Sequence, residues 1–308
     1  MATNNFKSFG IGAGANVISQ ADYETLAALL TGFQSGKASS AQINKALRQS
    51  STMAYVLAQF ICDSASVDVL DNGTPATILA NLKAAMTAVT PGRLINTTIF
   101  KASGSFTPRP DTKWIRVKGV GNGANGAGVP ATSSSQVADA GGGGGGGFFE
   151  AIFTSGFSGT TTVTIGAAAA LTTTTANDAN ACSFGSLISV PGAKGGAGSL
   201  QASTVPYHEA GGGVGSLPVI TGAAWSIVSQ GTSGSNGKVV TTYSSSGFGA
   251  SSQYGAGGIG YVRAGASTGG GNASGYGAGG GGGAASTSGS AQIGGLATLG
   301  IFIVEEYT

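Results

Sequence analysis

The side chains able to support catalysis are few in this 308-residue chain. His208 is its only histidine, so a Ser/His/Asp triad would have to use the segment Tyr207-His208-Glu209 beside Gly211–Gly213. A metal site built on two histidines is excluded for the same reason. We interpret His208 as a polar loop residue and predict no catalytic residue and no metal ligand.

Carboxylates are also scarce after Lys118. Glycoside hydrolysis needs two of them flanking one bond. The six present are Asp139, Glu150, Asp178, Glu209, Glu305 and Glu306, and we expect most of them on loops or strand ends. A polysaccharide depolymerase or deacetylase therefore stays open as an alternative, although the sequence offers few carboxylates for its active site.

Cofactor and metal motifs are weak. Cys62 and Cys182 lie far apart without any CxxC pair, which disfavours a disulfide framework or a zinc site, and Cys62 fits a small core residue. Gly121–Gly126 matches GxGxxG, but the glycines and proline that follow oppose the helix that a dinucleotide site requires. We predict no cofactor.

Charge and hydropathy exclude further classes. The net charge of +2 is too balanced for a nucleic-acid binder. No run of 18 apolar residues is present, so we expect no membrane insertion. The N-terminus lacks a secretory signal, which predicts synthesis in a cytoplasm and, for action outside a cell, release by lysis as a virion component is.

Glycine dominates the second part of the chain. Residues 91–308 hold 51 of the 57 glycines, yet residues 119–308 carry only nine charged side chains and many aromatic ones. Disorder requires low hydrophobicity and high charge, so we predict an ordered structure in which glycine permits close backbone packing or positive φ. Aromatics among small polar residues are typical of binding surfaces. Those placed in glycine-rich loops, our candidate contact residues for a binding partner, are Tyr207, Phe248, Tyr254, Tyr261 and Tyr276.

Residues 1–92 have helical periodicity. Ser19 with Asp22 predicts a first helix that ends near Gly32. Ser39 with Gln42 predicts a second, whose apolar stripe from Ile43 runs to about Cys62, and Thr74-Pro75 predicts a third. Three such helices bury little alone, so we expect them to pack against copies of themselves or a larger assembly.

From residue 93 the period becomes two, which predicts strands. The expected strands are Leu94–Lys101, Lys113–Lys118, Phe148–Thr154, Thr160–Ile165, Phe184–Val190, Ala224–Val228, Val239–Tyr243 and Leu299–Glu305. Many strands without intervening helices indicate a sandwich, with the last strand central and Trp114, Phe149, Phe153 and Phe302 in its core. The fold class is α+β: a helical N-terminal module (1–92) and an all-β, glycine-rich domain (93–308).

The glycine-rich segments Gly119–Gly147 and Gly247–Ala291 are too long for plain connections and are expected to be excursions from the sandwich. Tyr254-Gly-Ala-Gly-Gly258 recurs as Tyr276-Gly-Ala-Gly-Gly280. Such a repeat suits polyglycine-II strands, with three residues per turn and bonds between neighbours. The sequence leaves these strands and irregular loops as open alternatives.

The chain resembles tail fibre proteins of tailed bacteriophages, particularly those of siphophages and prophages of Pseudomonas and enterobacteria. The N-terminal likeness lies in Phe6–Asn16, Gln20–Glu24, Gly36–Lys45 and Val69–Gly73. The C-terminal likeness, to the glycine-rich domain of such fibres, lies in Phe106-Thr-Pro108, Trp114–Val117, Gly141–Gly147, Thr160–Ile165, Ser183-Phe-Gly185 and Ile301–Glu306. The chain lacks a long shaft repeat.

The resemblance implies a homotrimeric, non-enzymatic receptor-binding protein at the tail tip of a virion. Its N-terminal region would dock on a tail or baseplate protein, and its glycine-rich domain would bind a bacterial surface receptor: a pilus, lipopolysaccharide or an outer-membrane protein. Besides the enzyme, a passive structural tail-tip subunit stays open as an alternative. The aromatic loop set favours the receptor-binding hypothesis over that passive subunit.

Overall fold

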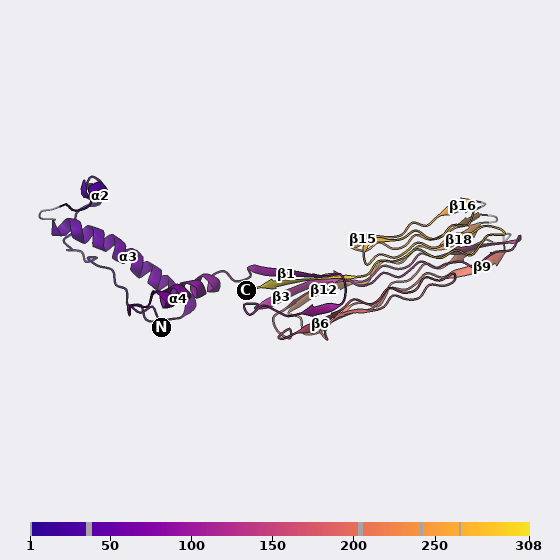
Figure 1. Ribbon diagram of the computed structural model, residues 1–308, viewed down its shortest axis with the longest axis horizontal. Coiled ribbons are helices and arrows are strands. Elements are labelled where there is room, and N and C mark those ends of the chain that lie inside the picture. Colours follow the sequence, from indigo (N-terminus) through magenta and orange to yellow (C-terminus); the bar gives the residue numbers. More distant parts are fainter. Residues whose placement is uncertain (1, 35–38, 203–205, 241–242, 265) are drawn as a thin grey trace. The chain divides into compact units, whose positions relative to one another are not determined.

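A computed structural model describes residues 2–34, 39–202, 206–240, 243–264 and 266–308. The chain forms two compact units, Met1–Arg93 and Leu94–Thr308. The first is helical and the second consists of antiparallel sheets joined by long glycine-rich segments, so the fold class is α+β and rich in β structure (Figure 1). Because the two units are separate bodies, each is described by itself.

The helical unit contains α1 (Gln20–Glu24), α2 (Ala28–Thr31), α3 (Ser40–Ala65) and α4 (Pro75–Ala88). The first expected helix is therefore broken into two short ones. Ser19 does cap α1 by accepting a hydrogen bond from the Asp22 N–H. Neither α1 nor α2 buries a residue, and a short helix without a packed apolar face has little to stabilise it. Ser39 makes no side-chain cap on α3, contrary to expectation.

Only one end of the apolar stripe of α3 is packed. Ile61 and Cys62 are buried against α4 and Val69, so Cys62 is a core residue as predicted. The other end is uncovered: Ile43 is 37% exposed, Leu47 48% and Leu57 47%. The helical unit thus leaves a row of large apolar side chains that are only partly covered, with Phe9 beside Leu47.

The first and last strands of the β unit belong to a sandwich of two five-stranded sheets. One sheet has the order β1 (Leu94–Phe100), β19 (Ile301–Tyr307), β3 (Trp114–Val120), β5 (Phe148–Phe153) and β12 (Trp225–Ser229). The other has β11 (Val219–Ile220), β8 (Ile188–Val190), β7 (Cys182–Phe184), β6 (Thr161–Thr164) and β2 (Gly104–Phe106). Phe149, Phe153 and Phe302 are fully buried in the core, as predicted, and β19 is internal to its sheet.

Two predictions about the sandwich are wrong. Trp114 is not in the core: it is half-buried on the outer face, stacked on Tyr307 with ring centroids 3.9 Å apart. The expected strand 184–190 is instead the hairpin β7–β8, because Gly185 takes a φ of +51° and turns the chain.

Outside the sandwich, the expected strand 239–243 is also wrong as one element. It divides between β13 and β14, and residues 241–242 lie outside the described ranges.

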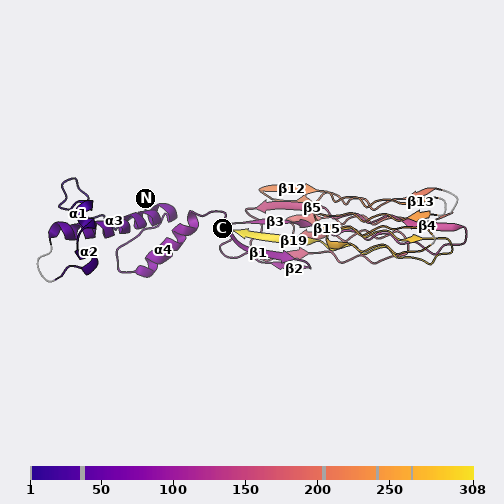
Figure 2. The same cartoon turned by 90° about the horizontal axis from the view of Figure 1, so that it is seen from above.

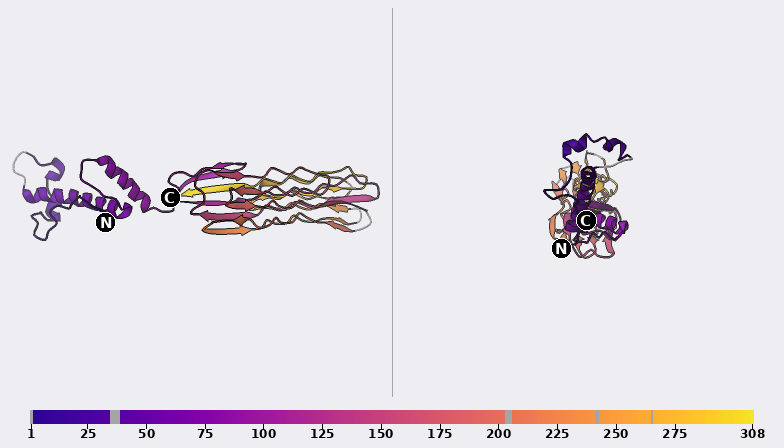
Figure 3. Two further views of the ribbon diagram at one scale, coloured as in Figure 1. Left: turned by 90° about the horizontal axis from the view of Figure 1, so that it is seen from below. Right: turned by 90° about the vertical axis from the view of Figure 1, so that its left-hand side faces the viewer.

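Beyond the sandwich the chain runs back and forth as long, nearly parallel segments without regular sheet pairing (Figures 2 and 3). We call them the glycine bundle. Its central segment, residues 140–147, exchanges backbone hydrogen bonds of 2.7–3.1 Å with neighbours on every side. The partner segments are 121–127, 194–197, 212, 232–235, 247–250 and 277–280.

The bonding pattern has a period of three. Gly141 and Gly144 donate to residues 197 and 194, Gly142 and Gly145 to 235 and 232, and Gly143 and Gly146 to 280 and 277. Three residues per turn, with bonds only to neighbours, is the polyglycine-II arrangement. The alternative that the sequence left open, irregular loops, does not apply to this segment.

Close packing, and not positive φ, explains these glycines. Residues 141–147 all lie outside the positive-φ region. A Cβ at Gly143 would collide with the carbonyl oxygen of Ala124, and one at Gly146 with that of Gly121. Any other residue would force the backbones apart and break their bonds.

At the end away from the sandwich, two small sheets pack together (Figure 2). One has the order β10 (Tyr207–Glu209), β13 (Gly237–Val240), β14 (Tyr243–Ser245) and β16 (Val262–Ala264). The other has β18 (Ala284–Ala285), β4 (Gln136–Ala140) and β9 (Gly198–Ala202). A short pair, β15 (Tyr254–Ala256) with β17 (Ser274–Tyr276), lies nearer the sandwich (Figure 1).

Candidate functional site

Large apolar side chains gather on the outer face of the four-stranded sheet β10–β13–β14–β16. Alternation along β13 and β14 turns Val239 and Ser244 inward, where both are buried, and Val240 and Tyr243 outward. Val262 of β16 is 72% exposed. With three residues per turn, Ile259 falls on the same side as Val262, and Phe248 on the same side as Ser245. We call this set the apolar patch: Val240, Tyr243, Phe248, Ile259 and Val262.

The patch is unusual for a solvent-facing surface. Exposed fractions of its members run from 49% for Val240 to 72% for Val262. Its strands are hydrogen-bonded to one another and continue into the glycine bundle, so the apolar side chains are carried by an ordered backbone. The exposed Lys238 lies on the same outer face, as the cross-strand partner of Ser245. Large apolar side chains gathered on one face in this way mark a candidate interaction site.

The structure brings together only some of the five predicted contact residues. Phe248 is 55% exposed and belongs to the apolar patch, and Tyr261 is half-buried beside Val262. Tyr207 lies in β10 opposite the buried Val239, so it points toward the packed side of the sheet.

Tyr254 and Tyr276 form a separate pair. They are direct cross-strand partners in β15 and β17, and each is half-buried. The Lys101 Nζ lies 5.9 Å from the Tyr276 ring centroid, within reach of a cation–π interaction. The sequence repeat thus produces a local two-stranded pair near the sandwich, away from the apolar patch.

The sequence analysis missed Val240, Tyr243, Ile259 and Val262 as surface residues. The sequence analysis expected one continuous strand over residues 239–243, in which Val240 and Tyr243 would face opposite sides. In the structure they are cross-strand partners in β13 and β14 and share the outer face. The spacing of Ile259 and Val262 carried a signal, because a three-residue period puts them on one side once polyglycine-II geometry is assumed.

The sparse polar residues occupy strands more than loops. His208 lies in β10, not in a loop, and is exposed, whereas Glu209 beside it is buried on the opposite face. Glu150 and Glu305 lie within β5 and β19, where they pair with Arg116 and Lys118 on the outer face of the sandwich. Among the described residues there is no group of three or more His, Cys, Asp or Glu able to hold a metal.

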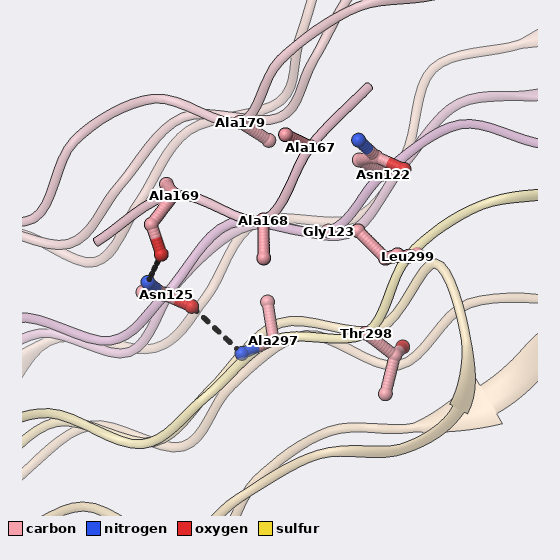
Figure 4. A pocket seen from close by; sticks show the side chains of 10 residues that line it. All are labelled: Asn122, Gly123, Asn125, Ala167, Ala168, Ala169, Ala179, Ala297, Thr298 and Leu299. Carbon is pink, nitrogen blue, oxygen red and sulfur yellow. Dashed lines mark hydrogen bonds between the residues drawn. The ribbon is translucent and has the colours of Figure 1, made fainter. Parts of the chain in front are cut away.

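Asn122 and Asn125 tie the glycine bundle together near the sandwich. The Asn122 amide donates to the carbonyl of Gly166 at 2.8 Å and its Oδ1 accepts from the Gly300 N–H at 2.6 Å. Asn125 likewise bridges Ala169 and Ala297 (Figure 4). The cavity between them measures about 10 Å³, room for one water at most. Gly121–Gly126, the segment that matches GxGxxG, therefore serves to join neighbouring segments of the bundle, and no helix follows it.

Within the described ranges no helix has the length and apolar character needed to cross a membrane. The chain matches no protein-family model and no curated protein.

Proposed function

We propose that this chain is a receptor-binding tail fibre protein of a tailed bacteriophage, acting by adhesion and without catalysis. The observation that carries the proposal is the apolar patch on a scaffold bonded through its backbone. The resemblance in the N-terminal and glycine-rich segments supports the same assignment, and it implies a position at the tail tip of a virion.

The scaffold suits adhesion because it is already ordered. Residues 140–147 engage hydrogen-bonded neighbours on every side, so the strands carrying the patch have little freedom left to lose on binding. A preordered surface avoids part of the entropy cost of association. Tyr243 and Phe248 add rigid contact area of the type enriched in binding surfaces.

The helical unit supplies the proposed assembly surface. Leu47 lines an open groove of about 370 Å³ together with Phe9, Ser50 and Ala54. Ile43, Leu47, Ser50, Ala54 and Leu57 follow the alternating four- and three-residue spacing of a coiled-coil seam. We assign this face to homotrimer formation, with the unit docked on a tail or baseplate protein.

Two other functions remain as alternatives to test. The depolymerase or deacetylase would need a functional pair of acids, and the buried pair Asp139 and Glu209 is the one that the fold brings together away from the ion pairs. A passive tail-tip subunit would leave the apolar patch without a role.

Competition with phage adsorption tests the proposal. Purified full-length protein should block adsorption to host cells, and Phe248→Ser with Tyr243→Ser should weaken that block by about tenfold or more, because central aromatic contacts dominate such interfaces. The control is Trp225→Ser, which removes an aromatic side chain 48% exposed on the sandwich edge. Hosts lacking pili, O-antigen or a given outer-membrane protein identify the receptor class. Equal blocking by all variants would refute the assignment of the patch.

Assembly is tested separately. Leu47→Glu puts a charge in the proposed seam and should convert the trimer to monomer in sedimentation velocity. Gln49→Glu adds the same charge at an exposed position off the seam and should leave the trimer intact. A wild-type monomer at micromolar concentration would contradict the trimer.

A further inference from the structure

An open groove lies on the β unit where the glycine bundle joins the sandwich. Gly146 and Phe148 form its floor, residues 229–232 at the end of β12 form one wall, and residues 251–253 just before β15 form the other. The groove measures about 380 Å³, within the size range of small-ligand sites. It lies nearer the sandwich than the apolar patch does, because its floor and one wall include the ends of sandwich strands.

Backbone contacts fix the shape of the groove. The Gly145 N–H donates to the Thr232 carbonyl at 2.9 Å, and a Cβ on Gly145 would lie 3.0 Å from the Ser251 carbonyl oxygen, so both walls rest against the central segment of the bundle. The Thr232 hydroxyl donates to the Ser251 carbonyl at 2.7 Å and joins the two walls. The Ser252 N–H donates to the Gly255 carbonyl at 2.9 Å in a tight turn. A ligand would therefore enter a preformed site, which lowers the entropy cost of binding.

Two amide side chains line the groove, one from each wall. Gln230 and Gln253 are both exposed, and neither side chain makes a hydrogen bond within the described ranges. The Ser252 hydroxyl, by contrast, is already used, because it donates to the Tyr276 carbonyl. Each amide offers two donor hydrogens and an acceptor oxygen. The groove can thus pair with groups that both donate and accept, from two sides.

Phe148 adds an aromatic surface to the floor. It is the first residue of β5, and alternation places it on the outer face of the sheet with Ser229, away from its buried neighbour Phe149. Its side chain is half-buried and lines the groove. None of the described residues lining the groove is charged. The site therefore combines one aromatic ring, two unpartnered amides and a neutral lining.

We infer that this groove binds an uncharged saccharide, the size of a mono- or disaccharide unit. A sugar ring presents a face of C–H groups, which packs on an aromatic ring, and a rim of hydroxyl groups, which both donate and accept hydrogen bonds. Phe148 meets the C–H face, and Gln230 and Gln253 meet the hydroxyl groups.

Other small ligands fit the lining less well. A phosphate or carboxylate group would find no cationic side chain among the lining residues, although such groups are bound most strongly by Arg or Lys. An apolar ligand would cover Gln230 and Gln253 without pairing their amides, which costs free energy. The inference depends on the groove alone and not on the apolar patch or the proposed function.

An array of bacterial oligosaccharides, neutral and anionic, tests the groove with the full-length protein. We expect neutral oligosaccharides to be bound, and titration calorimetry with the best of them then gives a Kd. Failure to bind any neutral oligosaccharide would overturn the inference. Binding of anionic oligosaccharides alone would overturn the choice of an uncharged ligand.

Variants locate the site. Gln230→Ala and Gln253→Ala should each raise the Kd by about tenfold, because each removes hydrogen bonds to the sugar, and the Tm should stay unchanged because both side chains are exposed. Phe148→Leu keeps an apolar side chain but removes the aromatic face, and it should also raise the Kd. Gln49→Ala makes the same amide deletion at an exposed position of α3 and should leave the Kd unchanged.

The groove and the apolar patch can be tested separately. The patch variant with Tyr243→Ser and Phe248→Ser should bind the oligosaccharide with the parent Kd, whatever its effect on adsorption. Parent affinity in a chain carrying both Gln230→Ala and Gln253→Ala would show that the saccharide binds elsewhere and would overturn the site.

Discussion

Replacing Gly143 by alanine puts one methyl group at the centre of the glycine bundle. Its Cβ would collide with the carbonyl oxygen of Ala124, and the neighbouring carbonyl of Asn125 lies 2.5 Å from the same position. Both obstacles are backbone atoms, so no side-chain rotation relieves the clash. The segments must separate, or the methyl group must be left out of the bundle.

The cost follows from the bonds around Gly143. Its N–H donates to Gly280 at 2.8 Å, its carbonyl accepts from Ala250 at 2.9 Å, and the Ala124 N–H donates to Gly144 at 2.9 Å. Each buried bond contributes about 1 kcal/mol net, and overpacking adds roughly 1–3 kcal/mol. We therefore expect a loss of about 4–6 kcal/mol in the free energy of unfolding, or a fall of roughly 10–20 °C in Tm.

Gly213→Ala is the matched control. Gly213 also lies in a glycine segment, but its φ is not positive and the nearest atoms to a Cβ are those of Lys194 at 3.9 Å. Alanine should be neutral there, or stabilise by about 0.4–1 kcal/mol by restricting the unfolded chain. Thermal and denaturant unfolding of both full-length variants measures the difference. Should the two variants melt within 2 °C of each other (a margin of about 1 kcal/mol or less), close backbone packing would not be the reason for glycine at 143.

Further outcomes follow from other contacts. Gly257→Val and Gly279→Val should destabilise the β unit, because a Cβ would meet the carbonyl oxygens of Gly249 and Gly143; a linker would tolerate both, and unchanged melting would show that. Asn122→Ala should cost roughly 2–4 kcal/mol by leaving the Gly166 carbonyl and Gly300 N–H unpaired, measured by urea unfolding. Burial would raise the pKa of Glu306, but hydrogen bonds from the Arg109 N–H, Asn96 and Thr112 outweigh it and hold that pKa below its usual value. Its contribution is thus present at neutral pH and lost as pH falls through the folded pKa, so Glu306→Gln should melt lower at pH 7 and approach the parent near pH 3; a constant gap across that range would contradict the assignment.

The sandwich was predictable from sequence because side chains report their environment there. Alternation through Ile115 and Val117 predicted β3, and Phe149, Phe153 and Phe302 were placed correctly in the core. Trp114 was misplaced because alternation divides the residues of a strand between two faces of the sheet but does not say which face is covered by the other sheet. Its position on the polar face, in line with Arg116, was the better guide.

The glycine bundle was harder to predict for a physical reason. A run such as Gly141–Gly147 has no side chains, so it carries no pattern that reveals which segments lie beside it. Its neighbours are set by backbone bonds between residues up to 137 positions apart, as between Gly143 and Gly280. The buried pair Asp139 and Glu209 escaped prediction likewise, because β4 is packed on both faces only after distant strands assemble.

The bundle also depends on what encloses it. Glycine loses more conformational freedom on folding than any other residue and buries little apolar area, so hydrogen bonds alone give these segments a narrow margin. Apolar cores lie at both ends: the phenylalanine-rich sandwich, and the alanine-rich cluster that includes Ala127, Val129 and Ala285. Because the glycine segments pass from one core to the other, each core fixes the register of the bonds between them. A large cavity at one end, as in Phe302→Ala, should therefore raise amide exchange throughout residues 140–147 and not only within β19.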